Sequence, residues 1–159
     1  MKNLSTLLCL LCILGGVSSG CKKDSEEKEG NGDNRYLYQE KTLSIEHASF
    51  TNAVYFNNNI MSIVLKATEV SNEIQLLFYK SPVTIPQGTF TYMDNAAAGY
   101  DPAKHFSGGY VKTDISKSDE IRSGTVVITK TGDNYNLKIN AVTSKGLVEG
   151  SYTGKINER

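Results

Sequence analysis

The fold is decided by residues 123–156, which read SGTVVITKTGDNYNLKINAVTSKGLVEGSYTGKI. Apolar and polar residues alternate from Tyr135 to Ala141, a period of two that predicts a strand with one buried face and one wet face. Gly132-Asp133-Asn134 and Ser144-Lys145-Gly146 separate this run from its neighbours, and short loops containing glycine join antiparallel strands. The stretch therefore predicts a three-stranded antiparallel meander.

The chain from Arg35 onward has the same character, with period-two alternation, β-branched and aromatic residues and frequent turn residues. We therefore expect an all-β domain over residues 35–159, an antiparallel meander of about 8–9 strands. It forms either a lipocalin-like barrel or a β-sandwich, and Gly150 and Gly154 on the last strand favour the curvature of a closed barrel. The expected strands are Tyr36–Glu46, Phe50–Phe56, Ile60–Val70, Glu73–Tyr79, Thr89–Met93, Phe106–Thr113, Arg122–Thr131, Tyr135–Thr143 and Leu147–Ile156.

Turn residues mark the connections between these strands. Asn57-Asn58-Asn59 and Ser71-Asn72 each separate two apolar runs, and asparagine tolerates the left-handed backbone of a tight turn. Two longer connections stand out: Ser81–Gly88, which contains two prolines, and Asp94–Lys104. Long loops on a rigid sheet often carry function, so these two are the first places to look for a site.

The N-terminal 20 residues have the order of a signal peptide: a basic start, an apolar run from Leu7 to Leu14, and then small residues up to Cys21. The apolar run is far shorter than the roughly 20 residues that a transmembrane helix needs. This order resembles a bacterial lipoprotein signal peptide, with Ser18 where leucine is usual. The resemblance implies that residues 1–20 are removed and that Cys21 is acylated. The alternative is an ordinary secretory signal.

Residues 21–34 are dense in charge near Cys21 and then rich in glycine, which predicts a solvated, flexible tether. The run Lys22–Glu29 is similar to the export signal of Bacteroidetes-type surface lipoproteins. That resemblance implies an outer-membrane protein held by acyl chains and facing the cell surface, with a periplasm-facing orientation as the alternative. Two or more chains hold a protein on a bilayer stably.

The resemblance extends to the domain. Residues 85–90 (IPQGTF), 123–130 (SGTVVITK) and 150–154 (GSYTG) look like segments of small all-β domains on Bacteroidetes-type lipoproteins, lipocalin-like barrels among them. These are turn and strand residues, so they bear on the fold rather than on an activity.

Charge and cysteine content exclude several classes of protein. The chain has 17 basic and 17 acidic residues and so no basic field to attract nucleic acid. Its three cysteines lie at positions 9, 12 and 21, so the mature domain is expected to have neither a disulfide nor a cysteine-ligated metal.

The 9 tyrosines suggest a binding surface, because tyrosine combines an apolar ring with a hydroxyl. Tyr92, Tyr100 and Tyr110 flank the Asp94–Lys104 loop, and His105 ends it. These four residues are the candidate ligand-binding set. The alternative is that most tyrosines pack in the core with the hydroxyl at its rim.

Enzymatic and metal-binding interpretations have little support. His47 and His105 are far apart in sequence, and Asp94, Asn95 and Asp101 match no calcium loop, so we expect no metal and no cofactor. Asp119-Glu120 is an unlikely pair for glycoside chemistry, since neighbours on an extended chain point to opposite faces, and a solvated turn is the preferred interpretation.

The sequence thus predicts a non-enzymatic, lipid-anchored module that binds a small ligand or glycan. The second hypothesis is a structural or accessory subunit of an outer-membrane complex, which has an envelope protein as its partner. A hydrolase ranks last, because no catalytic motif is present.

Overall fold

The computed structural model describes residues 34–67 and 71–159, and the described chain is all-β. The predicted signal peptide, Cys21 and all but the last residue of the predicted tether lie outside the described residues. The strands are β1 (Arg35–Tyr38), β2 (Lys41–Tyr55), β3 (Asn58–Ala67), β4 (Glu73–Tyr79), β5 (Gly88–Tyr92), β6 (His105–Phe106), β7 (Gly108–Asp114), β8 (Lys117–Thr131), β9 (Asn134–Thr143), β10 (Gly146–Gly154) and β11 (Ile156–Glu158).

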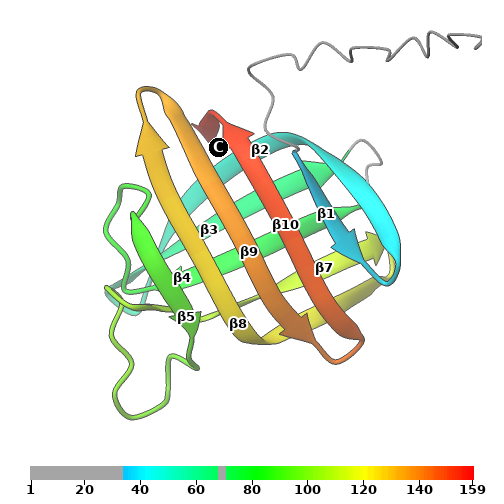
Figure 1. Cartoon of the computed structure of the whole chain (residues 1–159). Coiled ribbons are helices and arrows are strands. Elements are labelled where there is room, and N and C mark those ends of the chain that lie inside the picture. The colour runs from blue at the N-terminus through cyan, green and yellow to red at the C-terminus, as the bar shows by residue number, and fades with distance from the viewer. Residues whose placement is uncertain (1–33, 68–70) are drawn as a thin grey trace, which may run out of the picture.

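Eight antiparallel strands close into a barrel (Figure 1). Going around it, the order is β8-β7-β4-β3-β2-β1-β10-β9, and β9 pairs with β8 to complete the ring. Of the two architectures expected, the lipocalin-like barrel is therefore confirmed. β5 pairs with the second half of β8, β6 lies parallel to β5, and β11 lies parallel to β2.

Two long strands, β2 and β8, form the corners at which the barrel wall bends. Each has 15 residues, and each has a register shift one residue after an isoleucine, at Glu46 after Ile45 and at Arg122 after Ile121. A bulge of this kind bends the strand and increases its twist. Before its bulge β2 pairs with β1, and before its bulge β8 pairs with β7; after the bulges they pair with β3 and β9.

The barrel thus consists of two four-stranded meanders of the same plan, β1–β4 and β7–β10. The second strand has 15 residues in both halves, and the third has 10 residues in both. Two-residue turns connect the first three strands of each half. The C-terminal half contains the meander predicted from residues 123–156, which is confirmed.

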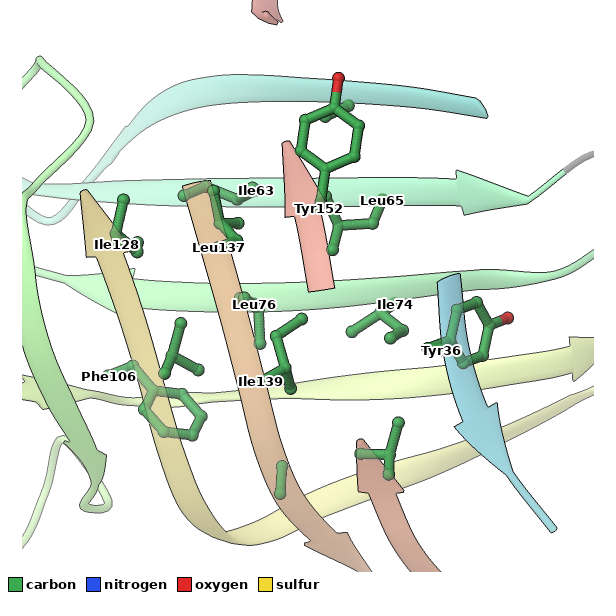
Figure 2. Packing of buried hydrophobic residues seen from close by; sticks show 14 of the residues in the cluster. Tyr36, Ile63, Leu65, Ile74, Leu76, Phe106, Ile128, Leu137, Ile139 and Tyr152 are labelled. Atoms are coloured by element: carbon green, nitrogen blue, oxygen red, sulfur yellow. The ribbon is translucent and has the colours of Figure 1, made fainter. Parts of the chain in front are cut away.

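Side chains fill the interior of the barrel. Inward-facing residues of β3 and β4, such as Ile63 and Leu76, meet those of β8 and β9, such as Ile128 and Ile139, in one continuous cluster (Figure 2). Tyr36, Ile63, Leu76 and Ile128 are fully buried, so the space between the walls is a packed core.

Several expected strands needed correction. The expected strand Tyr36–Glu46 is two strands, because Gln39 and Glu40 adopt a left-handed backbone (φ 49° and 63°) and form a tight turn. The structure also joins the expected Phe50–Phe56 strand to the second of these. Two further expected strands are interrupted, at Ser107 and at Lys155. Val70, the expected end of another strand, lies outside the described residues.

The turn expected at Asn57-Asn58-Asn59 begins one residue earlier than predicted. Its two central residues are Phe56 and Asn57, with φ of 46° and 61°, and Asn58 already belongs to β3. A bulky side chain with this backbone is a rare outlier, since left-handed conformations cost an ordinary residue about 1–2 kcal/mol.

Two glycines test how tightly the wall is packed. A Cβ at Gly124, where φ is 131°, meets the Ala141 Cα and the Asn140 carbonyl oxygen of β9 at 2.4 Å, whereas a Cβ at Gly146, where φ is 136°, meets nothing within 4 Å. Both alanine variants have a similar backbone strain, so Gly146→Ala is the control. We expect Gly124→Ala to lower the free energy of unfolding by about 1–3 kcal/mol more than Gly146→Ala does, measured by urea denaturation. Equal losses would contradict a close approach of β8 to β9.

Candidate ligand site

The first loop of the candidate site, residues 80–87, leaves β4 through Lys80, whose φ is 55°. Two prolines stiffen the loop, and Ile85 turns inward, where it is 6% exposed and belongs to the core cluster. An apolar anchor in the middle of a loop holds the residues on either side of it against the barrel.

Two asparagines of the neighbouring hairpin hold the start of this loop. The Asn52 amide donates to the Val83 carbonyl at 2.8 Å, and the Asn59 amide donates to the Ser81 carbonyl at 3.0 Å. These bonds join the loop to β2 and β3 and satisfy carbonyl groups that no strand pairs.

The second loop, residues 93–104, is folded by two aspartates. Asp94 accepts a hydrogen bond from the Ala96 backbone N–H at 2.8 Å, and Asp101 accepts one from the Ala103 N–H at 2.9 Å. Such Asx turns replace a backbone turn. The hydrogen bond from Ala103 and the contact with Lys104 hold the pKa of Asp101 below its usual value.

Tyr100 fastens the second loop to β4, and His105 contacts Tyr100 and Asp101 within that loop. The Tyr100 hydroxyl donates to the Tyr79 carbonyl at 3.0 Å and accepts from the Tyr79 N–H at 3.2 Å. The Tyr100 ring lies 5.8 Å from that of His105, whose Nδ1 accepts the Asp101 N–H at 3.0 Å. Burial raises the pKa of Tyr100, so it keeps its proton and remains a donor.

Between the two loops lies a groove of about 460 Å³, which we call the proline groove. Its floor includes Phe90, whose ring lies edge-on to Phe78 at 5.2 Å and is part of the packed core. The groove is lined by Lys80, Pro82, Thr84, Ile85, Pro86, Gln87, Phe90, Pro102 and Ala103.

The lining combines apolar side chains with three different polar groups. The rings of Pro82, Pro86 and Pro102 suit the apolar face of a ligand. Thr84, Gln87 and Lys80 supply a hydroxyl, an amide and an ammonium group for its oxygens. A concave apolar surface with a few polar groups is the usual composition of a small-molecule site.

The structure brings together three of the four predicted site residues, but as supports for the groove. Tyr100 and His105 hold the loop that supplies Pro102 and Ala103, and Tyr92 packs at 5.7 Å on Phe106, the neighbour of His105. None of these three lines the groove itself.

Tyr110 lies apart from the other three, on the outer wall of β7. Its hydroxyl donates to the Glu73 carboxylate at 2.8 Å. Burial, together with the hydrogen bond to Glu73 and its charge, raises the pKa of Tyr110 to about 12.

Sequence reasoning selected both loops but missed the side chains that line the groove. Pro82, Pro86 and Pro102 were visible as loop prolines, and that was the available signal. Ile85 and Phe90 could not be selected in this way, because both belong to the core and their apolar character is that of any buried strand residue.

A second concavity, of about 530 Å³, lies on the outer wall of the barrel. It is lined by side chains and backbone of β1, β2, β9 and β10, among them Arg35, Lys138 and Glu149. We prefer the proline groove as the ligand site because two anchored loops wall it and a core aromatic residue forms its floor.

The acidic residues considered at the sequence level have structural partners. Asp119 and Glu120 lie within β8, so the solvated turn expected there is wrong. The Asp119 carboxylate accepts a hydrogen bond at 2.8 Å from the buried Tyr38 hydroxyl. Burial, opposed by a bond to Thr143 and reinforced by Asp119, raises the pKa of Tyr38. Across residues 34–67 and 71–159, no three His, Asp or Glu side chains are placed to hold a metal.

No family model, curated protein or solved structure matches the chain. The described part of the chain also contains no helix long and apolar enough to cross a membrane.

Tyr100→Phe tests the support of the second loop. It removes the hydroxyl that bonds both the Tyr79 carbonyl and the Tyr79 N–H and leaves the ring in place, so we expect a loss of about 1–3 kcal/mol in the free energy of unfolding. Faster amide exchange in residues 99–105, measured by hydrogen–deuterium exchange, should accompany it. Tyr55→Phe, at an exposed ring, is the matched control and should change neither quantity.

Tyr110 makes the stability of the barrel sensitive to alkaline pH. Its folded-state pKa of about 12 lies above the unfolded value of about 10, so its stabilising contribution is complete below pH 10. That contribution is lost as the pH rises toward 12. We expect the stability of Tyr110→Phe to fall less steeply over this range, measured as urea midpoints against pH. Identical slopes in the two proteins would contradict the assignment.

Proposed function

We propose that the protein is a lipid-anchored, non-enzymatic binding module of the bacterial cell envelope, which holds a small ligand or glycan in the proline groove. The observation that carries the proposal is the groove itself: two loops, each fastened to the barrel by its own hydrogen bonds, face one another across an apolar floor. Its volume lies within the range of about 300–1,000 Å³ that is usual for ligand sites.

The interior of the barrel supports an external site. A lipocalin-like barrel with a ligand inside needs unfilled space between its walls, and here Ile63, Leu76 and Ile128 occupy that space with no exposed surface. A ligand therefore has to bind outside the interior, and the proline groove offers a concave site where the wall is interrupted by connections rather than strands.

The composition of the groove favours an uncharged or anionic ligand with both an apolar face and several oxygens. Pyranose sugars have this combination, since their C–H faces pack on apolar rings while their hydroxyls take hydrogen bonds. Thr84 and Gln87 can serve such hydroxyls, and Lys80, the one charged residue of the lining, suits an acidic substituent.

The membrane anchor rests on the sequence. Cys21 follows a signal-like segment, and residues 22–33 separate it from Asn34, where the described domain begins. Asn34 is held by Thr153, whose N–H donates to the Asn34 amide oxygen at 2.7 Å. Neither Asn34 nor Thr153 lines the proline groove, so the described domain begins away from it.

Native mass spectrometry of the protein purified from its own host tests the proposal directly. We expect a bound mass that survives purification and that is lost or reduced in Lys80→Ala and in Ala103→Trp, which places a large ring at the groove. Ser118→Trp, in a separate concavity at the β7–β8 turn, is the matched control and should keep the bound mass. A wild-type protein without any bound mass, or one whose bound mass is insensitive to both groove variants, would contradict the site.

A second candidate function, an accessory subunit of an envelope complex, is favoured by one observation. Leu147 and Val142 are cross-strand partners on the outer wall and are 46% and 40% exposed, and Leu37 beside them is 44% exposed. Crosslinking in the host separates the two functions, because an accessory subunit should be captured on this wall and not at the groove.

A further inference from the structure

The hairpin between β2 and β3 presents its largest apolar side chains to solvent. Val54, Tyr55 and Phe56 are 77%, 61% and 81% exposed, and Val83 of the neighbouring loop is 69% exposed. The rings of Tyr55 and Phe56 pack edge-to-face at 4.4 Å. We call these four residues the aromatic tip. The hairpin projects from the same end of the barrel as the loops of the proline groove (Figure 1).

Phe56 occupies a backbone position that disfavours it. Its φ of 46° is left-handed, a conformation that asparagine tolerates and bulky residues rarely adopt, and three asparagines follow it directly. The 81% exposed ring gains little packing in return. A strained residue without a structural benefit indicates that its side chain serves an interaction outside the fold.

The tip is held firmly. Asn59 donates to the carbonyls of Ser81 and Pro82 at 3.0 and 3.2 Å, and Asn52 donates to that of Val83 at 2.8 Å. Three side-chain hydrogen bonds therefore join the base of the hairpin to the loop. The aromatic side chains are presented with little loss of conformational freedom on binding.

The two segments that form the tip carry little charge, which favours a lipid surface, and the neighbouring end of β11 adds one acidic and one basic residue, Glu158 and Arg159, beside Phe50. The described stretches 48–65 and 74–93 contain no aspartate or glutamate, and their one charged side chain is that of Lys80. Tyrosine, phenylalanine and lysine together are typical of segments that enter the bilayer interface, where lipid phosphates are negative.

The shape of the tip points the same way. A stable protein interface buries about 800 Å² on each partner, and two aromatic residues of about 150–250 Å² each with two valines fall short of that area. A narrow convex hairpin also suits a deformable lipid surface better than a flat protein face.

We propose that the aromatic tip inserts into the interfacial layer of a phospholipid bilayer. It is a second membrane contact, distinct from the acyl chains expected on Cys21. The proposal goes beyond the proposed function, which needs only the anchor and the groove.

The absence of tryptophan from the sequence makes the test direct, because one introduced tryptophan reports one position. Phe56→Trp places the probe at the tip. Ile115→Trp is the matched control, because Ile115 is 80% exposed and lies in the β7–β8 turn at the opposite end of the barrel. Both are made in the full chain and mixed with vesicles of phosphatidylethanolamine and phosphatidylglycerol. We expect a blue shift and quenching by brominated acyl chains for Trp at position 56 and neither for Trp at position 115.

A partition measurement shows how much the aromatic tip contributes to vesicle binding. In the Cys21→Ser chain, replacing Tyr55 and Phe56 by serine should lower the vesicle partition coefficient by at least about tenfold, while Ile115→Ser leaves it unchanged. No shift for either probe, or equal shifts for both, overturns the proposal. So does a shift at position 56 that arises without vesicles as protein concentration rises, since a second copy of the chain then covers the tip.

Sedimentation of wild-type chain and Cys21→Ser with the same vesicles reports on the anchor separately. If the wild type sediments while the probe at position 56 stays in water, the tip proposal fails and the anchor stands. If the wild type binds no more strongly than Cys21→Ser while the probe at position 56 shifts, the anchor of the proposed function fails and the tip proposal stands.

Discussion

Closure of the barrel is the constraint on which the rest of the molecule depends. An eight-stranded ring pairs backbone groups that an open sheet would leave at its edges, but only if the wall bends enough to meet itself. The bulges at Glu46 and Arg122 supply that bend in β2 and β8. Close approach of the backbones at Gly124 and Ala141 then allows β8 to pair with β9. The packed core follows, because closure leaves a narrow interior for the inward side chains to fill.

The strands whose residues alternate and whose turns contain glycine or asparagine could be predicted from sequence. β4 has its expected bounds, and β9 and β10 come close to theirs, whereas β8 begins at Lys117 and not at the expected Arg122. The turn at Gln39-Glu40 could not, because neither residue is a usual turn former and the pairing of β1 with both β2 and β10 imposes it. At Phe56-Asn57 the register of β2 on β3 likewise overrides local preference. Barrel and sandwich differ only in long-range pairing, which local patterns do not encode.

The candidate site was predictable as a place and not as a set of side chains. Proline and polar residues identified both loops, because such segments cannot continue a strand. Which residues face the groove depends on how the loops are fastened, and those fastenings are distant in sequence: Asn59 holds Ser81, and Tyr100 holds Tyr79. Tyrosine was expected to line the candidate site, and Tyr100 instead supports the loop behind the proline groove. Its hydroxyl bonds the N–H and the carbonyl of Tyr79, which a phenylalanine could not do.

The two ends of the barrel differ because their connections differ. At one end two-residue turns close β1–β2, β7–β8 and β9–β10, and residues 68–72 connect β3 to β4. At the other end, long connections surround the exit of β4 and both sides of β5. Pro82 lines the proline groove and Val83, the next residue, belongs to the aromatic tip. The proposed insertion of the tip into a bilayer would therefore fix how far the groove stands from the lipid surface. A groove held at the height of the head groups encounters ligands that are themselves concentrated at that surface.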